Sequence, residues 1–148
     1  MELAGILKKH IEKLNPIKVC IDVGGGGVGV YDRLCELFPK HILELVHFNG
    51  KALDSMKYYN RRDQMWGELA EFIKKDGYIV FDDTLLQQIS NIEYSYNSLG
   101  QLKIESKDEI KKRLKASPDG GDACALTFAG ERKIEIQMSK EEFNPFVW

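Results

Sequence analysis

Three aspartates stand at positions from which they could bind divalent metal ions. Asp22 ends a run of apolar residues and is followed closely by four glycines, whereas Asp119 and Asp122 lie three residues apart at the start of a predicted helix. Side chains three residues apart share one face of a helix, so the pair could meet Asp22 in a cluster about 8 Å across. Carboxylate oxygens are the ligands that Mg²⁺ and Mn²⁺ prefer, and two such ions can activate water for phosphodiester hydrolysis.

The acid pair also has a purely structural interpretation. Carboxylates in the first turn of a helix are stabilised by the helix dipole, by about 0.3–1 kcal/mol each. The metal hypothesis therefore depends on Asp22. That residue ends a predicted core strand, and ligands of open α/β sheets bind at the carboxyl ends of the strands.

The glycine run allows a different class of site. Gly24, Gly26 and Gly29 match the G-x-G-x-x-G pattern of dinucleotide-binding βαβ modules, and Glu44 follows at the distance of the ribose ligand. However, Glu44 lies in the middle of a predicted strand, and this hypothesis leaves Asp22 and the later acid pair without a role.

A basic stretch precedes the acid pair. It could position DNA phosphates beside a metal site, or it could be a solvated helix face whose charge is partly offset by Asp108 and Glu109. Arg61 and Arg62 present the same two alternatives. The residues that we expect to contact DNA are Lys103, Lys107, Lys111, Lys112 and Arg113.

The composition predicts one globular α/β domain. The chain has 148 residues, 43% of them apolar and 30% charged, and its net charge of −2 gives no overall sign of nucleic-acid binding. The three cysteines have no metal-ligand spacing and are expected to be reduced. No signal peptide or long apolar run is visible, so we expect a soluble intracellular protein without membrane contact.

The periodicity predicts the elements that would position these residues. Buried strands are expected at 17–23 and 42–48, joined by a helix at 28–38, and a hairpin with one apolar face at 92–104. Ser106 and Glu109 form a capping box, and Ser117 is the expected N-cap of the last helix. The other expected segments are helices at 3–14, 59–75, 84–89, 107–114 and 118–129, an extended segment at 78–81 and a short edge strand at 133–137.

Several of these motifs, in this order, resemble a known family. The chain resembles the C-terminal part of the nuclease domain of terminase large subunits, the DNA-packaging motors of tailed phages and prophages. The matching segments are IDVGGGGVGVYDRL, YYNRRDQMW, FDDTLLQQIS, LKIESKDEIKKR and SPDGGDACALTF.

The resemblance implies an RNase H-like, resolvase-related fold with a mixed sheet flanked by helices. It also implies Mg²⁺ or Mn²⁺ as cofactor, double-stranded DNA as substrate, a separate ATPase chain and the portal as partners, and the bacterial cytoplasm as location. Asp22 corresponds to the family's second acid, and Asp119 and Asp122 belong to the third motif. Residues 1–130 are expected to form the domain and residues 131–148 a tail.

Two departures from the family shape the functional expectation. The family's first strand, which carries the first acid, has no counterpart before Ile17, so we expect a domain truncated at the N-terminus with impaired cleavage unless Glu44 or Asp83 completes the site. A missing strand would also leave a sheet edge open to self-association or to the 133–137 segment. A non-catalytic DNA-binding or assembly module remains the main alternative.

Overall fold

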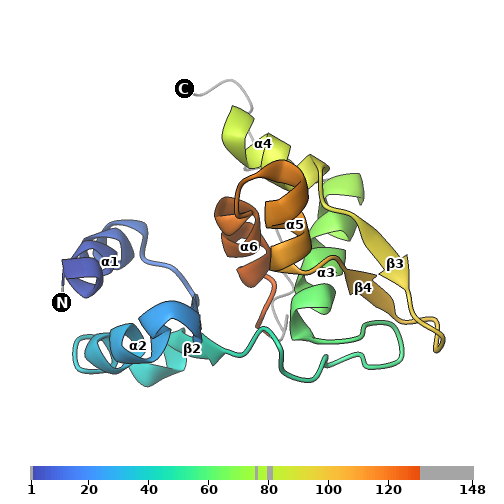
Figure 1. The fold of residues 1–148 in the computed structure, drawn as a ribbon. Coiled ribbons are helices and arrows are strands. Elements are labelled where there is room, and N and C mark those ends of the chain that lie inside the picture. Colours follow the sequence, from blue (N-terminus) through green and yellow to red (C-terminus); the bar gives the residue numbers. More distant parts are fainter. Residues whose placement is uncertain (1, 76, 80–81, 131–148) are drawn as a thin grey trace, which may run out of the picture.

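The computed structural model describes residues 2–75, 77–79 and 82–130. Helices surround two small pairs of strands, with α1 and α2 at one end of the molecule and α3 to α6 at the other (Figure 1). The predicted α/β class is confirmed. In chain order the elements are α1 (Glu2–Leu14), β1 (Val19–Asp22), the 3₁₀ turn η1 (Gly24–Gly26), α2 (Gly27–Cys35), the 3₁₀ turn η2 (Lys40–Ile42), β2 (Leu43–Val46), α3 (Arg61–Lys75), α4 (Asp83–Ser90), β3 (Tyr94–Tyr96), β4 (Leu102–Ile104), α5 (Lys107–Leu114) and α6 (Asp119–Leu126).

The parallel pair β1–β2 lies between two hydrophobic clusters. Its register pairs Val19 with Leu43 and Asp22 with Val46. Residues alternate between the faces of a strand, so Ile21 packs with α1 and α2, whereas Val46 packs in the cluster around α3 and α6. The expectation of a buried strand holds only in part for β1, because Ile21 alone of its four residues is buried and the other three are intermediate.

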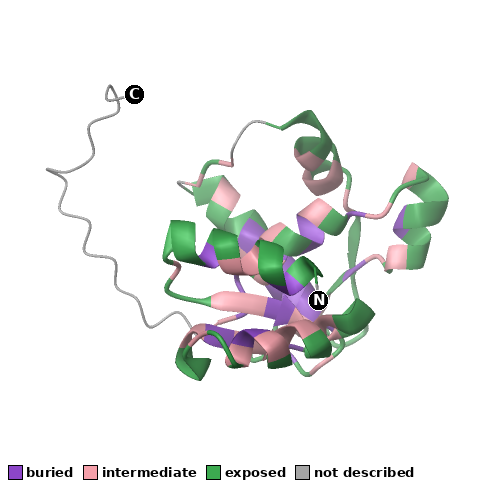
Figure 2. Cartoon of the chain, turned by 90° about the vertical axis from the view of Figure 1, so that its left-hand side faces the viewer, coloured by how far each residue is buried: buried purple, intermediate pink, exposed green. Residues whose placement is uncertain are grey.

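The larger cluster is organised around α3. Met65, Trp66 and Leu69 are buried on this helix, and Phe128 packs beside them after α6. Figure 2 shows the buried segments inside and the exposed faces of the helices outside. The side of α3 that carries these apolar residues is therefore the one that α6 and β4 cover.

The antiparallel pair β3–β4 forms the predicted hairpin, with Tyr94 opposite Ile104. The expected apolar face is only partly buried. Ile104 is 7% exposed, whereas Tyr94 and Tyr96 are 63% and 64% exposed and contact each other edge to face. The prediction fails for β3 because α3 packs against β4 and leaves the two tyrosines outside.

The starts of α4 and α5 follow local chemistry, whereas the start of α6 differs from the prediction. Ser106 and Glu109 form the predicted capping box of α5, and Asp82 caps α4 by accepting a hydrogen bond from Leu85 N. The prediction of Ser117 as a helix cap is wrong. Pro118 is the N-cap residue of α6, and the Ser117 hydroxyl instead donates to the Asp119 carboxylate, Oγ to Oδ1 2.6 Å.

The two glycines in α6 allow close packing. A Cβ on Gly121 would lie 2.6 Å from Cη2 of Trp66, and Gly121 N donates to Oε1 of Gln88 at 2.9 Å. Glycine costs helix stability, by about 1 kcal/mol relative to alanine. Here the absence of side chains at the two glycines permits α6 to approach α3 and α4.

Some predictions fall outside the described residues. They are the 133–137 strand, the tail at 131–148 and the end of the extended segment at 80–81, while Tyr78 and Ile79 belong to no strand. Of the helices described, none has the length and apolar character needed to cross a membrane.

Candidate functional site

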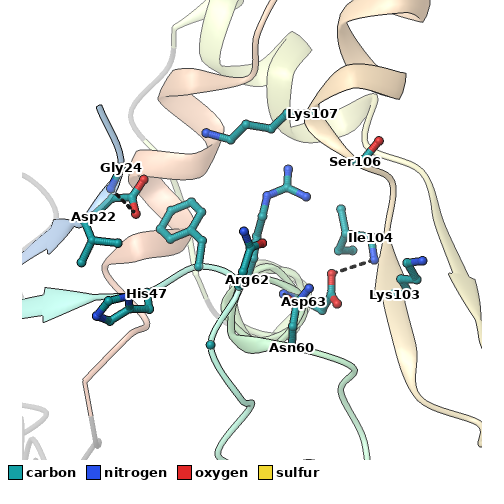
Figure 3. A pocket seen from close by; sticks show the side chains of 14 residues that line it. Asp22, Gly24, His47, Asn60, Arg62, Asp63, Lys103, Ile104, Ser106 and Lys107 are labelled. Carbon is teal, nitrogen blue, oxygen red and sulfur yellow. Dashed lines mark hydrogen bonds between the residues drawn. The ribbon is translucent and has the colours of Figure 1, made fainter. Parts of the chain in front are cut away.

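A cleft of about 700 Å³ opens where β1, α3, β4 and α5 meet. Asp22 stands at the carboxyl end of β1, Arg62 and Asp63 in the first turn of α3, and Lys103 and Lys107 on β4 and α5. In Figure 3 the Arg62 guanidinium group lies in the middle of the cleft, with Asp22 on one side and Asp63 on the other. The cleft therefore combines acids and bases from four elements that are distant in sequence.

Arg62 is a buried cation with a fixed orientation. Its side chain is 9% exposed, Nε lies 3.1 Å from Oδ1 of Asp122, and Nη1 donates to the carbonyl of Glu105 at 2.9 Å. The guanidinium carbon also lies 5.9 Å from the ring centre of Trp66, a cation–π distance. The third nitrogen, Nη2, is buried and has no hydrogen-bond partner among the described residues.

Asp122 is the acid at the centre of this network. Its side chain is 5% exposed, and Oδ1 accepts hydrogen bonds from Arg62 and from Nε1 of Trp66 at 2.8 Å. Nζ of Lys107 lies 2.9 Å from Oδ2 as an ion pair, although Oδ2 accepts no hydrogen bond within the described structure. Two cations and an indole N–H thus offset the cost of burying this carboxylate.

The three predicted metal ligands line one smaller hollow of about 220 Å³, which we call the acidic hollow. It adjoins the cleft, since Asp22 and Lys107 line both. Asp119 is exposed, and Asp22 accepts a hydrogen bond from Gly24 N at 3.2 Å. Tertiary folding therefore brings the strand-end acid and the helix-start pair to the same place.

The acids nevertheless do not form a ready metal cluster. Across the described ranges, no three His, Cys, Asp or Glu side chains are grouped closely enough to hold a metal ion. Lys107 is the cation next to Oδ2 of Asp122, and neither Glu44 nor Asp83 lines the acidic hollow. Metal binding at Asp22, Asp119 and Asp122 remains a prediction.

Asp63 is a buried acid of the cleft that the sequence analysis did not identify. It is 2% exposed, and Oδ1 accepts a hydrogen bond from Ile104 N at 3.0 Å, while Oδ2 has no partner in the described part of the chain. Burial raises the pKa of this carboxyl group above its ordinary value. The available signal was the run of three charged residues, Arg61 to Asp63, at the start of an otherwise amphipathic helix.

Of the five residues predicted to contact DNA, two line the cleft and three do not. Lys103 and Lys107 line the cleft. Arg113 instead forms ion pairs with Glu105 and Glu93, so it ties α5 to the hairpin region. Lys111 and Lys112 are exposed on α5 and line neither the cleft nor the acidic hollow.

The glycine run is explained by the turn after β1. Gly25 and Gly26 have positive φ angles of 58° and 92°, and a Cβ on Gly27 would lie 1.7 Å from the carbonyl oxygen of Asp22. Only Gly26 of these three belongs to the dinucleotide pattern. Glu44 pairs with Lys18 at 3.6 Å from the middle of β2, so neither Glu44 nor the geometry of the glycine turn favours a dinucleotide site.

The fold is similar to solved nuclease domains of a phage terminase. The nuclease domain of the large terminase subunit gp2 of bacterial virus Sf6 matches with a TM-score of 0.71 at 16% identity, over 86% of this chain and 71% of that one. A mutant of the Sf6 domain with calcium gives the same TM-score, identity and coverage. Another solved with manganese gives 0.67 at 17% identity, over 86% and 72% of the two chains.

At the level of sequence, no family model and no curated protein matches this chain. The likeness to the Sf6 structures is therefore a likeness of fold. This chain has the α/β fold of a terminase nuclease domain.

Proposed function

We propose that this chain is a nuclease domain of a phage DNA-packaging terminase, which cleaves double-stranded DNA with Mg²⁺ or Mn²⁺. The shared fold supports the class of protein. The observation that carries the chemistry is the acidic hollow, where Asp22, Asp119 and Asp122 face the same space beside a cleft with three basic side chains. Carboxylates can hold the metal that activates the attacking water, and cations can hold the phosphates of the DNA backbone.

The donor atoms of the acidic hollow suit a hard divalent cation. Its three acids offer only oxygen ligands, and Oδ2 of Asp122 is buried without a hydrogen bond. A bound ion would supply Lewis-acid stabilisation of the charge on the phosphate. The proposal requires Lys107 to give up its place next to Asp122 Oδ2.

The other residues of the network have roles of their own. Arg62 and Trp66 both bind Oδ1 of Asp122, so they fix the orientation of the carboxylate and leave Oδ2 for a ligand. Lys107 neutralises Oδ2 while no metal is bound, which limits the repulsion among the acids. The basic side chains of the cleft then hold the DNA backbone near the acids.

We propose weak cleavage by this chain alone. Two-metal hydrolysis needs enough ligands to hold both ions about 3.5–4 Å apart. The described residues supply no group of three metal-binding side chains at one point. One loosely held ion is the expected state, and Asp22, Asp119 and Asp122 would have to move closer together around the acidic hollow to bind it.

The proposal extends to the setting of the domain. A terminase nuclease would act on double-stranded DNA in the cytoplasm of the bacterial host, with a motor ATPase chain and the portal as partners. Residues 1–130 would form the nuclease domain. The edge of β1 with which no other described strand pairs would allow pairing with a second copy.

One observation favours the alternative of a non-catalytic DNA-binding or assembly module. Asp122 is already paired with Arg62 and Lys107, and such pairs also occur where an acid only stabilises the fold. In that case the cleft would bind DNA and the acidic hollow would bind no metal.

A metal titration tests the proposal. Millimolar Mn²⁺ should raise the melting temperature of the wild-type chain, because ligand binding to the folded state stabilises it by mass action. The increase should disappear in Asp22→Asn and persist in Asp108→Asn, which removes an exposed carboxylate from α5. Cleavage of plasmid DNA should be weak or undetectable.

The outcomes separate the two functions. The same melting temperature with and without Mn²⁺ would remove the metal site and leave the assembly module. Robust metal-dependent cleavage would support the nuclease but contradict the proposed weakness, and would require a further ligand.

A further inference from the structure

The cleft contains a charged donor that the folded chain leaves unused. The side chain of Arg62 is only 9% exposed, and its Nη2 has no hydrogen-bond partner among the described residues. Leaving a charged N–H group buried and unpaired is costly. Such a group in a cleft of about 700 Å³ points to a ligand that supplies the missing acceptor.

The orientation of this donor is fixed before any ligand arrives. Asp122 binds Nε, the Glu105 carbonyl binds Nη1, and the Trp66 ring lies within cation–π distance. These three contacts hold the planar guanidinium group from several sides. Binding a ligand at Nη2 would therefore cost little side-chain conformational entropy. Arg62 lines the cleft, and Figure 3 shows it between Asp22 and Asp63.

The surrounding charges favour an anion at this position. Lys103 and Lys107 line the same cleft, and the N-terminus of α3, a helix of 15 residues, begins there with its positive dipole end. Two acids also line the cleft. Asp63 points away from Arg62 toward Ile104 N, and Asp22 lies on the side of the acidic hollow.

We infer that Nη2 of Arg62, together with Lys103 of the same cleft, forms a subsite for one phosphate of the nucleic-acid backbone. The inference rests on the proposed function and deepens it, because it places a DNA phosphate next to the acidic hollow. Arg62 is a positioning residue in this arrangement, since it binds a phosphate other than the one cleaved. A guanidinium N–H and an ammonium group are well suited to the oxygens of a phosphodiester.

The test uses DNA binding in EDTA, so its result is independent of metal binding and cleavage. The affinity of the full chain for a short duplex is measured at several salt concentrations. Lys103→Ala removes an exposed side chain and should weaken binding about tenfold. The plot of log K against log salt concentration has a negative slope, and the variant should make this slope about one less steep. Lys74→Ala, at the other end of α3, should change the affinity less than about twofold.

Arg62 is tested by NMR, because truncation would break its buried ion pair. The guanidinium N–H signals of Arg62 are assigned by their absence in Arg62→Lys, and are then followed in the wild type during titration with duplex DNA or inorganic phosphate. The expected result is a shift with the duplex that saturates along with binding. Arg62→Lys, which keeps the charge but loses Nη2, should bind the duplex as weakly as Lys103→Ala while its backbone spectrum remains that of a folded protein.

Two results would overturn the inference. One is Arg62 signals that do not move when the duplex is bound. The other is a shift with inorganic phosphate but not with the duplex, which would assign the subsite to a small phosphate compound. A failed Mn²⁺ titration would count against the nuclease proposal and leave this result unaffected.

Discussion

Nε of Arg62 lies 3.1 Å from Oδ1 of Asp122, and the side chains are only 9% and 5% exposed. This ion pair joins the first turn of α3 to the first turn of α6. Trp66 completes it by donating to the same carboxylate oxygen. An acid predicted as a metal ligand is thus also a central element of the fold, so its substitution affects stability and chemistry together.

Asp122→Ala should destabilise the chain by about 3–5 kcal/mol, because it leaves the buried Arg62 charge without its partner. Urea unfolding in EDTA, followed by circular dichroism, measures the change. Asp119→Ala is the matched control, since Asp119 is exposed and should contribute no more than about 1 kcal/mol through the helix dipole. Equal losses in both variants would contradict the central role of the buried pair.

Gly121→Ala should destabilise the chain by about 1–3 kcal/mol, although alanine favours helices. The added Cβ would lie 2.6 Å from Cη2 of the Trp66 ring, so α6 or the indole must shift. Gly5→Ala in α1 meets nothing within 4 Å and should stabilise the chain by about 0.4–1 kcal/mol. Thermal or urea unfolding measures the stability of the two variants, and so compares the effect of tight packing with that of helix propensity. If both substitutions stabilised the chain, α6 would not be tightly packed.

Lys107→Met should bind Mn²⁺ more tightly than the wild type. Nζ of Lys107 lies 2.9 Å from Oδ2 of Asp122, where it competes with any metal, and methionine removes the charge while keeping most of the side-chain length. Isothermal titration should show an affinity increase of about tenfold, equivalent to about 1.4 kcal/mol. Lys74→Met is the control for loss of one positive charge. Weaker Mn²⁺ binding by Lys107→Met would mean that the lysine supports the metal site.

Asp63→Asn should change how stability depends on pH. Burial raises the pKa of Asp63 in the folded chain, so between the ordinary value near 3.8 and the raised one the folded state binds more protons than the unfolded state. The contribution of Asp63 is therefore fully present below about pH 3.8 and is lost as pH rises through the folded pKa. As pH rises from the acid range, the free energy of unfolding of the wild type should therefore decrease relative to that of Asp63→Asn.

Glu109→Gln provides a contrast of opposite sign. The Ser106 N–H and hydroxyl lower the pKa of Glu109, so its contribution is present above its ordinary pKa and is lost as pH falls. Urea unfolding of both variants and the wild type between acid and neutral pH measures the two slopes. Parallel curves for the wild type and Asp63→Asn would contradict the burial of an ionisable Asp63.

Much of the local structure could be predicted because neighbouring residues determine it. The capping box of Ser106 and Glu109 and the cap at Asp82 are contacts within a few residues, and the structure contains both. The strand–glycine–helix unit at Asp22 also follows from local pattern, and so does the parallel pairing of β1 with β2. The sequence alone therefore placed the strand-end acid and the helix-start pair on their elements.

Only the tertiary structure decided how those acids are used. Arg62 and Trp66 are 60 and 56 residues away from Asp122, and no periodicity indicates that the start of α3 faces the start of α6. The same holds for the hairpin, where alternation predicted an apolar face but the position of α3 determined that β4 is covered and Tyr94 is not. A pattern identifies which residues share a face, whereas the elements packed against that face determine whether a carboxylate there meets solvent, a cation or an indole.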